Sequence, residues 1–341
     1  MINRVVIIAE AGVNHNGDIN LAKKLIEEAA HSKADYVKFQ TFKAKNLVSK
    51  IARKAAYQIK NSNGNDISQF QMLKNLEMPF EWHFELRDYA EKLGIKFLST
   101  GFDVQSLNFL NKLGVDFFKI PSGEITNKPF LIHVAGQGKP IVLSTGMATF
   151  VEVKDAVGIL CSNGISKKMI TVLHCNSEYP TLMKDVNLMA MLHIKNQLGL
   201  EVGYSDHTLG IEVPVAAVAL GARVIEKHFT LDKKMEGPDH LASLEPKELK
   251  IMVKAIRNVE LAILGSGFKE PSASEKKNRL ITRKSIHTNK PINSGDFITA
   301  EDLIMKRPGD GISPMEIGSI IERKVKFDLP AEHKLGWGDL Y

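Results

Sequence analysis

Short apolar runs rich in β-branched residues alternate along the chain with longer segments in which apolar positions recur at helical spacing. This alternation is typical of repeated βα units that build a parallel sheet. The apolar runs predict strands at 4–10, 35–40, 95–100, 116–120, 140–145, 170–176, 201–205 and 223–228. The amphipathic segments predict helices, for example at 21–32, 80–93, 104–113, 151–162, 211–220 and 246–264.

Strands and helices alternate through eight βα units, and no segment consists only of strands or only of helices. This pattern favours a closed (β/α)₈ TIM barrel, with an open, doubly wound sheet as the second choice. The predicted strands end in polar or charged residues. In such barrels the C-terminal strand ends and the loops that follow them form the active site. We therefore expect the chemistry on one face. The strand-end residues are Glu10, Lys38, Gln40, Thr100, Lys119, Ser144, Asn176, Asp206, His207 and His228.

The sequence predicts that the chain is organised in three segments. The barrel is expected to occupy residues 1–270, and a polar stretch rich in Pro, Ser and Lys is predicted as a linker at 271–280. Residues 281–341 contain short β-like runs and Gly/Pro turns, and predict a small β-rich domain. Its core would be marginal for an independent domain, so burial against the barrel or a partner subunit makes dimerisation an expectation.

The composition, 44% hydrophobic and 25% charged residues, is that of a globular protein and excludes a disordered or fibrous chain. The net charge is +6, but basic residues are scattered among acidic ones, so we expect no nucleic-acid partner. Cys161 and Cys175 are too few for a disulfide framework, although a single bridge is possible. The apolar run at the N-terminus is too short for a membrane span and lacks a cleavage pattern, which favours the cytoplasm.

Two histidines are the strongest candidate metal ligands: His207 follows the seventh predicted strand and His228 ends the eighth. Adjacent barrel strands can bring two imidazoles close enough to share an ion, and with oxygen ligands Mn²⁺, Mg²⁺, Zn²⁺ or Fe²⁺ would each be compatible. Alternatively, each histidine closes a strand end by hydrogen bonding. Glu10, at the end of the first strand, could act as a general base or orient a metal-bound water, or it could pair with a lysine for structure.

Cations and hydroxyls recur at the strand ends, where a phosphate would find donors and compensating charge. This recurrence favours an anionic, phosphorylated substrate. Neither of the glycine-rich nucleotide-binding motifs, GxxxxGK[ST] and GxGxxG, occurs in the sequence. Asp239 lies on a loop after the last strand, where it could contact a polyhydroxylated substrate or simply form a turn. The phosphate set is Lys38, Thr100, Lys119, Ser122, Ser144 and Ser205.

Ten segments stand in one order along nearly the whole chain: AEAGVNHNGD, YVKFQTF, FLSTGFD, FKIPSGEITN, IVLSTGM, LHCNSEYPT, GYSDHT, IEKHFTLD, GPDHLASLEP and KRPGDGI. With these segments the chain resembles the sialic acid synthase family. The resemblance implies a TIM barrel followed by a C-terminal antifreeze-like (SAF) domain. It also implies metal-dependent condensation of phosphoenolpyruvate with an N-acylated aminosugar and water, which gives a nonulosonic acid and phosphate.

The resemblance also implies a role for each candidate. His207 and His228 would bind the metal, usually Mn²⁺ with Mg²⁺ or Co²⁺ as other options, and Glu10 would act through metal-bound water. The phosphate set would hold phosphoenolpyruvate. Arg307 matches the arginine that the SAF domain of one subunit inserts into its partner's site, which implies a domain-swapped homodimer. The aminosugar contacts would be Gln40, Glu124, Tyr179 and Asp239.

The acceptor stays open between N-acetylmannosamine and 2,4-diacetamido-2,4,6-trideoxymannose. Residues 176–180 read NSEYP, unlike the TNIYP of some N-acetylneuraminate synthases and more like the legionaminic acid synthases, and Glu178 would alter the acceptor pocket. A 3-deoxy-octulosonate-type phosphoenolpyruvate aldol synthase is the alternative enzyme. A non-catalytic glycan-binding barrel is the alternative from another class, but such a protein should have lost Glu10, His207 or His228.

Overall fold

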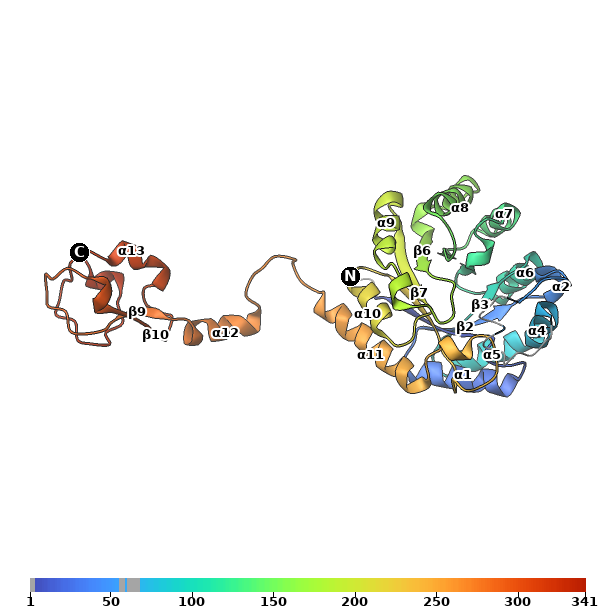
Figure 1. Cartoon of the computed structure of the whole chain (residues 1–341), viewed down its shortest axis with the longest axis horizontal. Helices are drawn as coiled ribbons and strands as arrows, with labels where there is room; N and C mark the ends of the chain where they lie inside the picture. The colour runs from blue at the N-terminus through green and yellow to red at the C-terminus, as the bar shows by residue number, and fades with distance from the viewer. Residues whose placement is uncertain (1–3, 55–58, 60–67) are drawn as a thin grey trace. The chain divides into compact units, whose positions relative to one another are not determined.

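The computed structural model describes residues 4–54, 59 and 68–341, and the chain forms two compact units, Met1–Leu264 and Gly265–Tyr341. The first unit contains a parallel sheet of order β3-β2-β1-β8-β7-β6-β5-β4, and contacts between β3 and β4 close it into a (β/α)₈ barrel (Figure 1). This confirms the predicted barrel and excludes the doubly wound sheet. The strands are β1 (Val6–Gly12), β2 (Tyr36–Thr41), β3 (Lys96–Gly101), β4 (Phe118–Ile120), β5 (Ile141–Ser144), β6 (Ile170–Cys175), β7 (Glu201–Asp206) and β8 (Val224–His228).

Helices cover the outer face of this sheet (Figure 1). Local signals mark their ends. Thr149 and Glu152 form a reciprocal capping box at the start of α8 (Phe150–Ser162), and Gly114 adopts a left-handed conformation at the end of α6 (Val104–Leu113). Within the described residues, no helix has the length and apolar character needed to cross a membrane. The helices of this unit are α1 (Ile19–His31), α2 (Ala44–Leu47), α4 (Gln69–Leu76), α5 (Phe80–Lys92), α6 (Val104–Leu113), α7 (Lys128–Ala135), α8 (Phe150–Ser162), α9 (Met189–Leu198), α10 (Glu212–Ala219) and α11 (Pro246–Ala262).

The predicted strands and helices all occur, and their ends differ from the predictions by at most two residues. Both faces of the strands are buried, because the helices cover one face and the barrel interior the other. In β8 the apolar Val224 and Ile225 give way to Glu226, Lys227 and His228, and all five side chains are buried. The C-terminal end of the barrel is therefore a polar interior, where each charge needs a partner.

The second unit is small and built from short strands. Strands β9 (Ser285–Thr288) and β10 (Leu303–Lys306) pair antiparallel, and isolated β-bridges connect the loops around them. The short helix α13 (Ile317–Ile320) contributes Ile320 to the apolar core of this unit. The apolar core contains Ile286, Ile292, Ile298, Leu303, Ile312, Ile320, Val325, Leu329, Leu335 and Leu340.

The structure differs from the linker prediction at the junction of the units. The division falls between Leu264 and Gly265, and helix α12 (Ala273–Thr282) occupies most of the predicted linker at 271–280. The physical reason is a capping box: the Ser272 side chain accepts from the Glu275 backbone amide, and the Glu275 side chain accepts from that of Ser272. The linker was predicted from the content of Pro, Ser and Lys alone, and residue content does not reveal where a helix begins.

A buried polar network joins β2, β3 and α5 in the barrel wall. The Nδ1 of His83 lies 3.0 Å from the Pro79 carbonyl and must donate to it, so Nε2 accepts from the Thr41 hydroxyl at 2.6 Å. Thr41 Oγ1 lies 2.6 Å from Ser99 Oγ. Burial lowers the pKa of His83 to about 4, so the imidazole is neutral in the folded protein.

We expect His83 to make the stability of the barrel pH-dependent. In the unfolded chain its pKa is near 6.5, so between about pH 6.5 and 4 the unfolded state binds more protons and the free energy of unfolding falls as the pH falls. In His83→Gln the free energy of unfolding should fall less between these pH values, by at most about 3 kcal/mol. Urea unfolding measured from pH 8 to 4 tests this. The control is His31→Gln, at an exposed side chain, and an unchanged slope in His83→Gln would contradict the prediction.

Candidate active site

The predicted site residues of the first unit line one pocket of about 540 Å³ at the C-terminal ends of the barrel strands. Arg307 lies in the second unit, where it is exposed directly after β10. The pocket also contains residues that the sequence analysis did not select, above all Glu226. The predicted residues in the pocket are Glu10, Lys38, Gln40, Thr100, Lys119, Ser122, Glu124, Ser144, Tyr179, Ser205, His207, His228 and Asp239.

Four buried charged groups form the floor of the pocket. Strand register places Glu10 beside Lys38 on β2, and Lys38 Nζ lies 2.6 Å from Glu10 Oε2. Glu226 on β8 lies between the lysines, with Oε2 3.6 Å from Lys38 Nζ and Oε1 3.5 Å from Lys119 Nζ. Ser205 Oγ donates to Glu226 Oε1 at 2.9 Å. Two carboxylates thus balance two ammonium groups in an interior where an unpaired charge would be costly.

Glu226 is the important site residue that the sequence analysis missed. A signal was present, because Glu226 stands two positions before His228 on the same strand and the side-chain period of a strand is two. If His228 faces the barrel interior, so must Glu226. Only the structure shows, however, that its carboxylate meets both Lys38 and Lys119.

Burial and neighbouring charges give the two carboxyl groups different pKa values. Burial raises the pKa of Glu10 to about 7, with Glu226 adding to the rise and Lys38 opposing it. Burial alone would also raise the pKa of Glu226, but Lys119 and Lys38 outweigh it and lower that pKa below the ordinary range. Glu226 therefore keeps its negative charge, and Glu10 is the group that exchanges a proton near neutral pH.

The two histidines meet at the wall of the pocket. The ring centroids of His207 and His228 are 5.3 Å apart, and the Tyr179 ring lies 4.0 Å from that of His207. Burial lowers the pKa of His207 to about 4, and burial together with His207 lowers that of His228 well below its ordinary value. Both imidazoles are therefore neutral, the form that binds metal ions.

The hydrogen bonds of these rings fit a metal site. His207 Nδ1 bonds the carbonyl of Asn176, which leaves the lone pair of Nε2 directed elsewhere. His228 Nδ1 is buried, finds no hydrogen-bond partner within the described part of the chain and lies 3.8 Å from Asp239 Oδ2. Among the residues that the structure describes, no cluster of three or more His, Cys, Asp or Glu could hold an ion. Oxygens of water or substrate would have to complete the coordination of an ion at these two rings.

Hydroxyl groups surround the charged floor. Thr100 accepts from Lys38 at 2.8 Å, and Ser122 accepts from the Gly146 amide at 2.9 Å. Ser144 Oγ is buried and has no hydrogen-bond partner among the residues that the structure describes. A buried hydroxyl without a partner is costly, so Ser144 is suited to a polar ligand in the pocket.

The residues predicted to contact a sugar lie around the same pocket. Gln40 Nε2 donates to Glu10 Oε1 at 3.1 Å, which ties the two side chains together. Burial raises the pKa of Asp239 to about 6. Glu124 accepts from Asn127 at 2.6 Å, and Glu178 also lines the pocket. Acceptors and donors for hydroxyl and amide groups are therefore present in the same pocket as the buried lysines.

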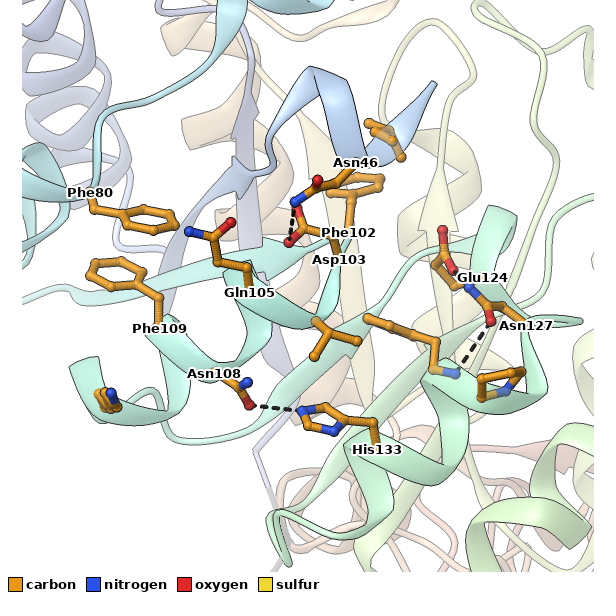
Figure 2. Close-up of a pocket in the computed structure, with 15 residues that line it drawn as sticks. Asn46, Phe80, Phe102, Asp103, Gln105, Asn108, Phe109, Glu124, Asn127 and His133 are labelled. Carbon is orange, nitrogen blue, oxygen red and sulfur yellow. Dashed lines mark hydrogen bonds between the residues drawn. The ribbon is translucent and has the colours of Figure 1, made fainter. Parts of the chain in front are cut away.

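A second hollow, of about 1100 Å³, shares Leu47, Phe102 and Glu124 with the first pocket and extends over α6 and α7 (Figure 2). Its polar side chains bond one another: Asn108 with His133 at 2.7 Å and Asn127 with Glu124 at 2.6 Å (Figure 2). The buried lysines and the paired histidines lie in the smaller pocket. We therefore assign the chemistry to that pocket.

The chain is similar to proteins of known activity. A model of the NeuB family matches residues 25–269. The chain is 54% identical over 331 residues to the N,N'-diacetyllegionaminic acid synthase of Campylobacter jejuni, covering 96% of this chain and 98% of that protein. It is 51% identical over 334 residues to the N,N'-diacetyllegionaminic acid synthase of Legionella pneumophila, covering 97% and 93%. A crystal structure of the sialic acid synthetase of Leptospira borgpetersenii is 38% identical with a TM-score of 0.71, covering 81% of this chain and 90% of that one.

Removing the charge of Glu226 should make the stability of the protein depend on an added anion. Glu226→Gln leaves Lys119 without its carboxylate partner and should lower the free energy of unfolding by about 3 kcal/mol. Inorganic phosphate should restore more stability to this variant than to the wild type, because it supplies the missing charge. Thermal unfolding at increasing phosphate concentrations measures both effects.

Glu124→Gln is the matched control, since Glu124 lines the same pocket but bonds an amide rather than a lysine. It should respond to phosphate as the wild type does. Equal stabilisation of Glu226→Gln and wild type by phosphate would show that Glu226 does not balance the lysines.

Proposed function

Since the chain belongs to the NeuB family and is a phosphoenolpyruvate-dependent transferase, we propose that it condenses phosphoenolpyruvate with 2,4-diacetamido-2,4,6-trideoxymannose. The products are N,N'-diacetyllegionaminic acid and phosphate. One observation carries the proposal: a pocket that joins the buried ammonium groups of Lys38 and Lys119 to two neutral imidazoles. Family membership stands against both alternatives, the 3-deoxy-octulosonate-type synthase and the non-catalytic glycan-binding barrel.

The donor would bind over the charged floor. Phosphoenolpyruvate carries a phosphate and a carboxylate, and Lys38 and Lys119 offer positive charge to both. The buried hydroxyl of Ser144 would donate to one of these groups, and the hydroxyls of Thr100, Ser122 and Ser205 lie in the same pocket. Fixed donors of this kind hold a polyanion in position and stabilise the charge that moves during the reaction.

A divalent ion would be held by His207 and His228, with Mn²⁺ as the first choice and Mg²⁺ or Co²⁺ as others. Such an ion supplies Lewis-acid polarisation of an aldehyde oxygen. In the proposed reaction the C2–C3 double bond of phosphoenolpyruvate supplies the electron pair for a bond from C3 to C1 of the open-chain sugar, and the C1 aldehyde oxygen takes a proton and becomes a hydroxyl group. Water adds at C2 and becomes a C2 hydroxyl group. The C2–O bond to phosphate then breaks, phosphate leaves, and the C2 hydroxyl loses its proton to give the C2 ketone. Glu10, with its pKa near 7, takes the proton of that water.

The acceptor assignment rests on the relatives and on the pocket. Both relatives above 50% identity are named N,N'-diacetyllegionaminic acid synthases. Glu178 lines the pocket next to Tyr179, at the segment where the sequence departs from some N-acetylneuraminate synthases. Gln40, Glu124 and Asp239 complete the sugar side. N-acetylmannosamine is the second candidate acceptor.

We also propose that the second unit is an antifreeze-like (SAF) domain whose Arg307 reaches the partner's aminosugar in a domain-swapped homodimer. The loop that carries Arg307 is held in place, since Ser285 Oγ donates to the Pro308 carbonyl at 2.7 Å and accepts from the Gly311 amide at 2.8 Å. Arg307 itself is exposed. A fixed loop that presents an exposed guanidinium is suited to bind a carbonyl oxygen of an N-acyl group.

The acceptor and the metal can be tested together. Metal-stripped protein, phosphoenolpyruvate and Mn²⁺ should release phosphate faster with 2,4-diacetamido-2,4,6-trideoxymannose than with N-acetylmannosamine, and mass spectrometry should identify the nine-carbon product. Chelator and His207→Ala should each abolish the release, because both remove the ion. Faster turnover of N-acetylmannosamine would reverse the acceptor assignment. Full turnover in the presence of chelator would show that the reaction needs no divalent ion.

Mixing two inactive homodimers tests the domain swap. In a heterodimer of His207→Ala and Arg307→Ala subunits, one barrel keeps its own His207 and receives an intact Arg307 from its partner. After subunit exchange, activity should recover to roughly a quarter of wild type, because half of the dimers are mixed and each has one intact site. If Arg307 acted within its own subunit, the mixture would stay inactive.

A further inference from the structure

We propose that a buried ion pair behind the pocket, Asp206 with Lys227, together with Thr208, fixes the positions of the two histidines and so sets the metal affinity of the site. These three are positioning residues, and none of them lines the pocket. The inference rests on the proposed function in one respect, that His207 and His228 hold a divalent ion.

The pair sits where β7 and β8 end. Asp206 and Lys227 are direct neighbours in the strand register, and both side chains have no exposed surface. Their neighbours in sequence, Ser205, Glu226 and His228, line the pocket. Because side chains alternate along a strand, Asp206 and Lys227 point to the opposite side of the barrel wall. The pair is therefore separated from substrate by the backbone of the two strands.

The contacts of the pair extend to the residue after His207. Lys227 Nζ lies 2.6 Å from Asp206 Oδ2 and also donates to the Thr208 carbonyl. Asp206 Oδ1 accepts from the Thr208 amide at 3.1 Å, and the Thr208 hydroxyl lies 3.0 Å from each oxygen of that carboxylate. Asp206, Lys227 and Thr208 thus form one closed network across both strands.

This network holds His207 from both sides. Residues 206 and 208 are each bonded to Lys227, which is itself the residue before His228. The carbonyl of His207 accepts from the Thr181 amide at 2.9 Å, and that of His228 accepts from the Leu244 amide at 2.8 Å. The network therefore adds a side-chain link, beyond the pairing of β7 with β8, between the two backbone segments that carry the imidazoles. If it loosens, the segment at His207 loses its side-chain contacts with the residue before His228, and the two rings are held less firmly relative to each other.

The energetics of buried ion pairs support a positional role. Removing two charges from water costs about as much as their attraction returns, so such a pair adds little net stability compared with apolar side chains of similar size. Its hydrogen bonds have direction, whereas apolar contacts do not. Groups that orient metal ligands from behind commonly change metal affinity when they are replaced.

The first test is Thr208→Val, which keeps the shape of the side chain and removes both hydroxyl contacts with Asp206. Thr41→Val is the matched control, because Thr41 is equally buried and its hydroxyl also bonds within the barrel wall, but to His83 and Ser99. Calorimetric titration of the metal-stripped proteins with Mn²⁺ gives the affinity, and urea unfolding gives the stability. A purely structural role predicts that both variants lose stability and neither loses metal affinity.

We expect Thr208→Val to bind Mn²⁺ about 10-fold more weakly than wild type, and Thr41→Val to bind as wild type does. The double variant Asp206→Leu/Lys227→Met replaces the whole pair by apolar groups and should weaken binding by about 10- to 100-fold. If the double variant does not fold, Thr208→Val decides the question. Wild-type affinity in Thr208→Val overturns the inference. Wild-type protein that binds no Mn²⁺, Mg²⁺ or Co²⁺ overturns the metal part of the proposed function, and the inference with it.

Discussion

The barrel depends on the balance of charge at its C-terminal end, where Glu10, Lys38, Glu226 and Lys119 are buried together. None of these groups could remain charged there alone. They meet only when β1, β2, β4 and β8 keep their register, because a shift by one residue would turn each side chain to the other face of its strand. The balance of charge and the register of the sheet therefore support each other.

The same balance gives chemically similar groups different properties. Glu226 lies between two lysines and stays charged, whereas burial leaves Glu10 able to exchange a proton near neutral pH. His207 and His228 are kept neutral by burial. Two buried ammonium groups, a carboxyl group with a pKa near neutral pH and a pair of neutral imidazoles thus occur in one pocket, the combination that the proposed reaction would use.

A second layer of polar contacts lies behind the barrel wall. The pair of Asp206 and Lys227 joins the strand ends that carry the imidazoles, and His83 joins β2 and β3 to α5. Most of the wall is apolar and could tolerate small shifts, but hydrogen-bonded groups of this kind have few alternative arrangements. The layer explains how side chains from several strands can be held at fixed positions around one ligand.

The sequence by itself determined the fold class, the strand count and most strand ends, because hydrophobic periodicity and cap signals are local. Strand-end positions, which all reach the same face of a barrel, selected part of the thirteen pocket residues, and the resemblance to a known family supplied others, among them Glu124 and Tyr179. The helix at Ala273–Thr282 was missed although its capping box is local. Only the tertiary structure decided that Glu226 balances both lysines and that Lys227 pairs with Asp206. Such pairings depend on register and burial, which bring together residues far apart in the chain.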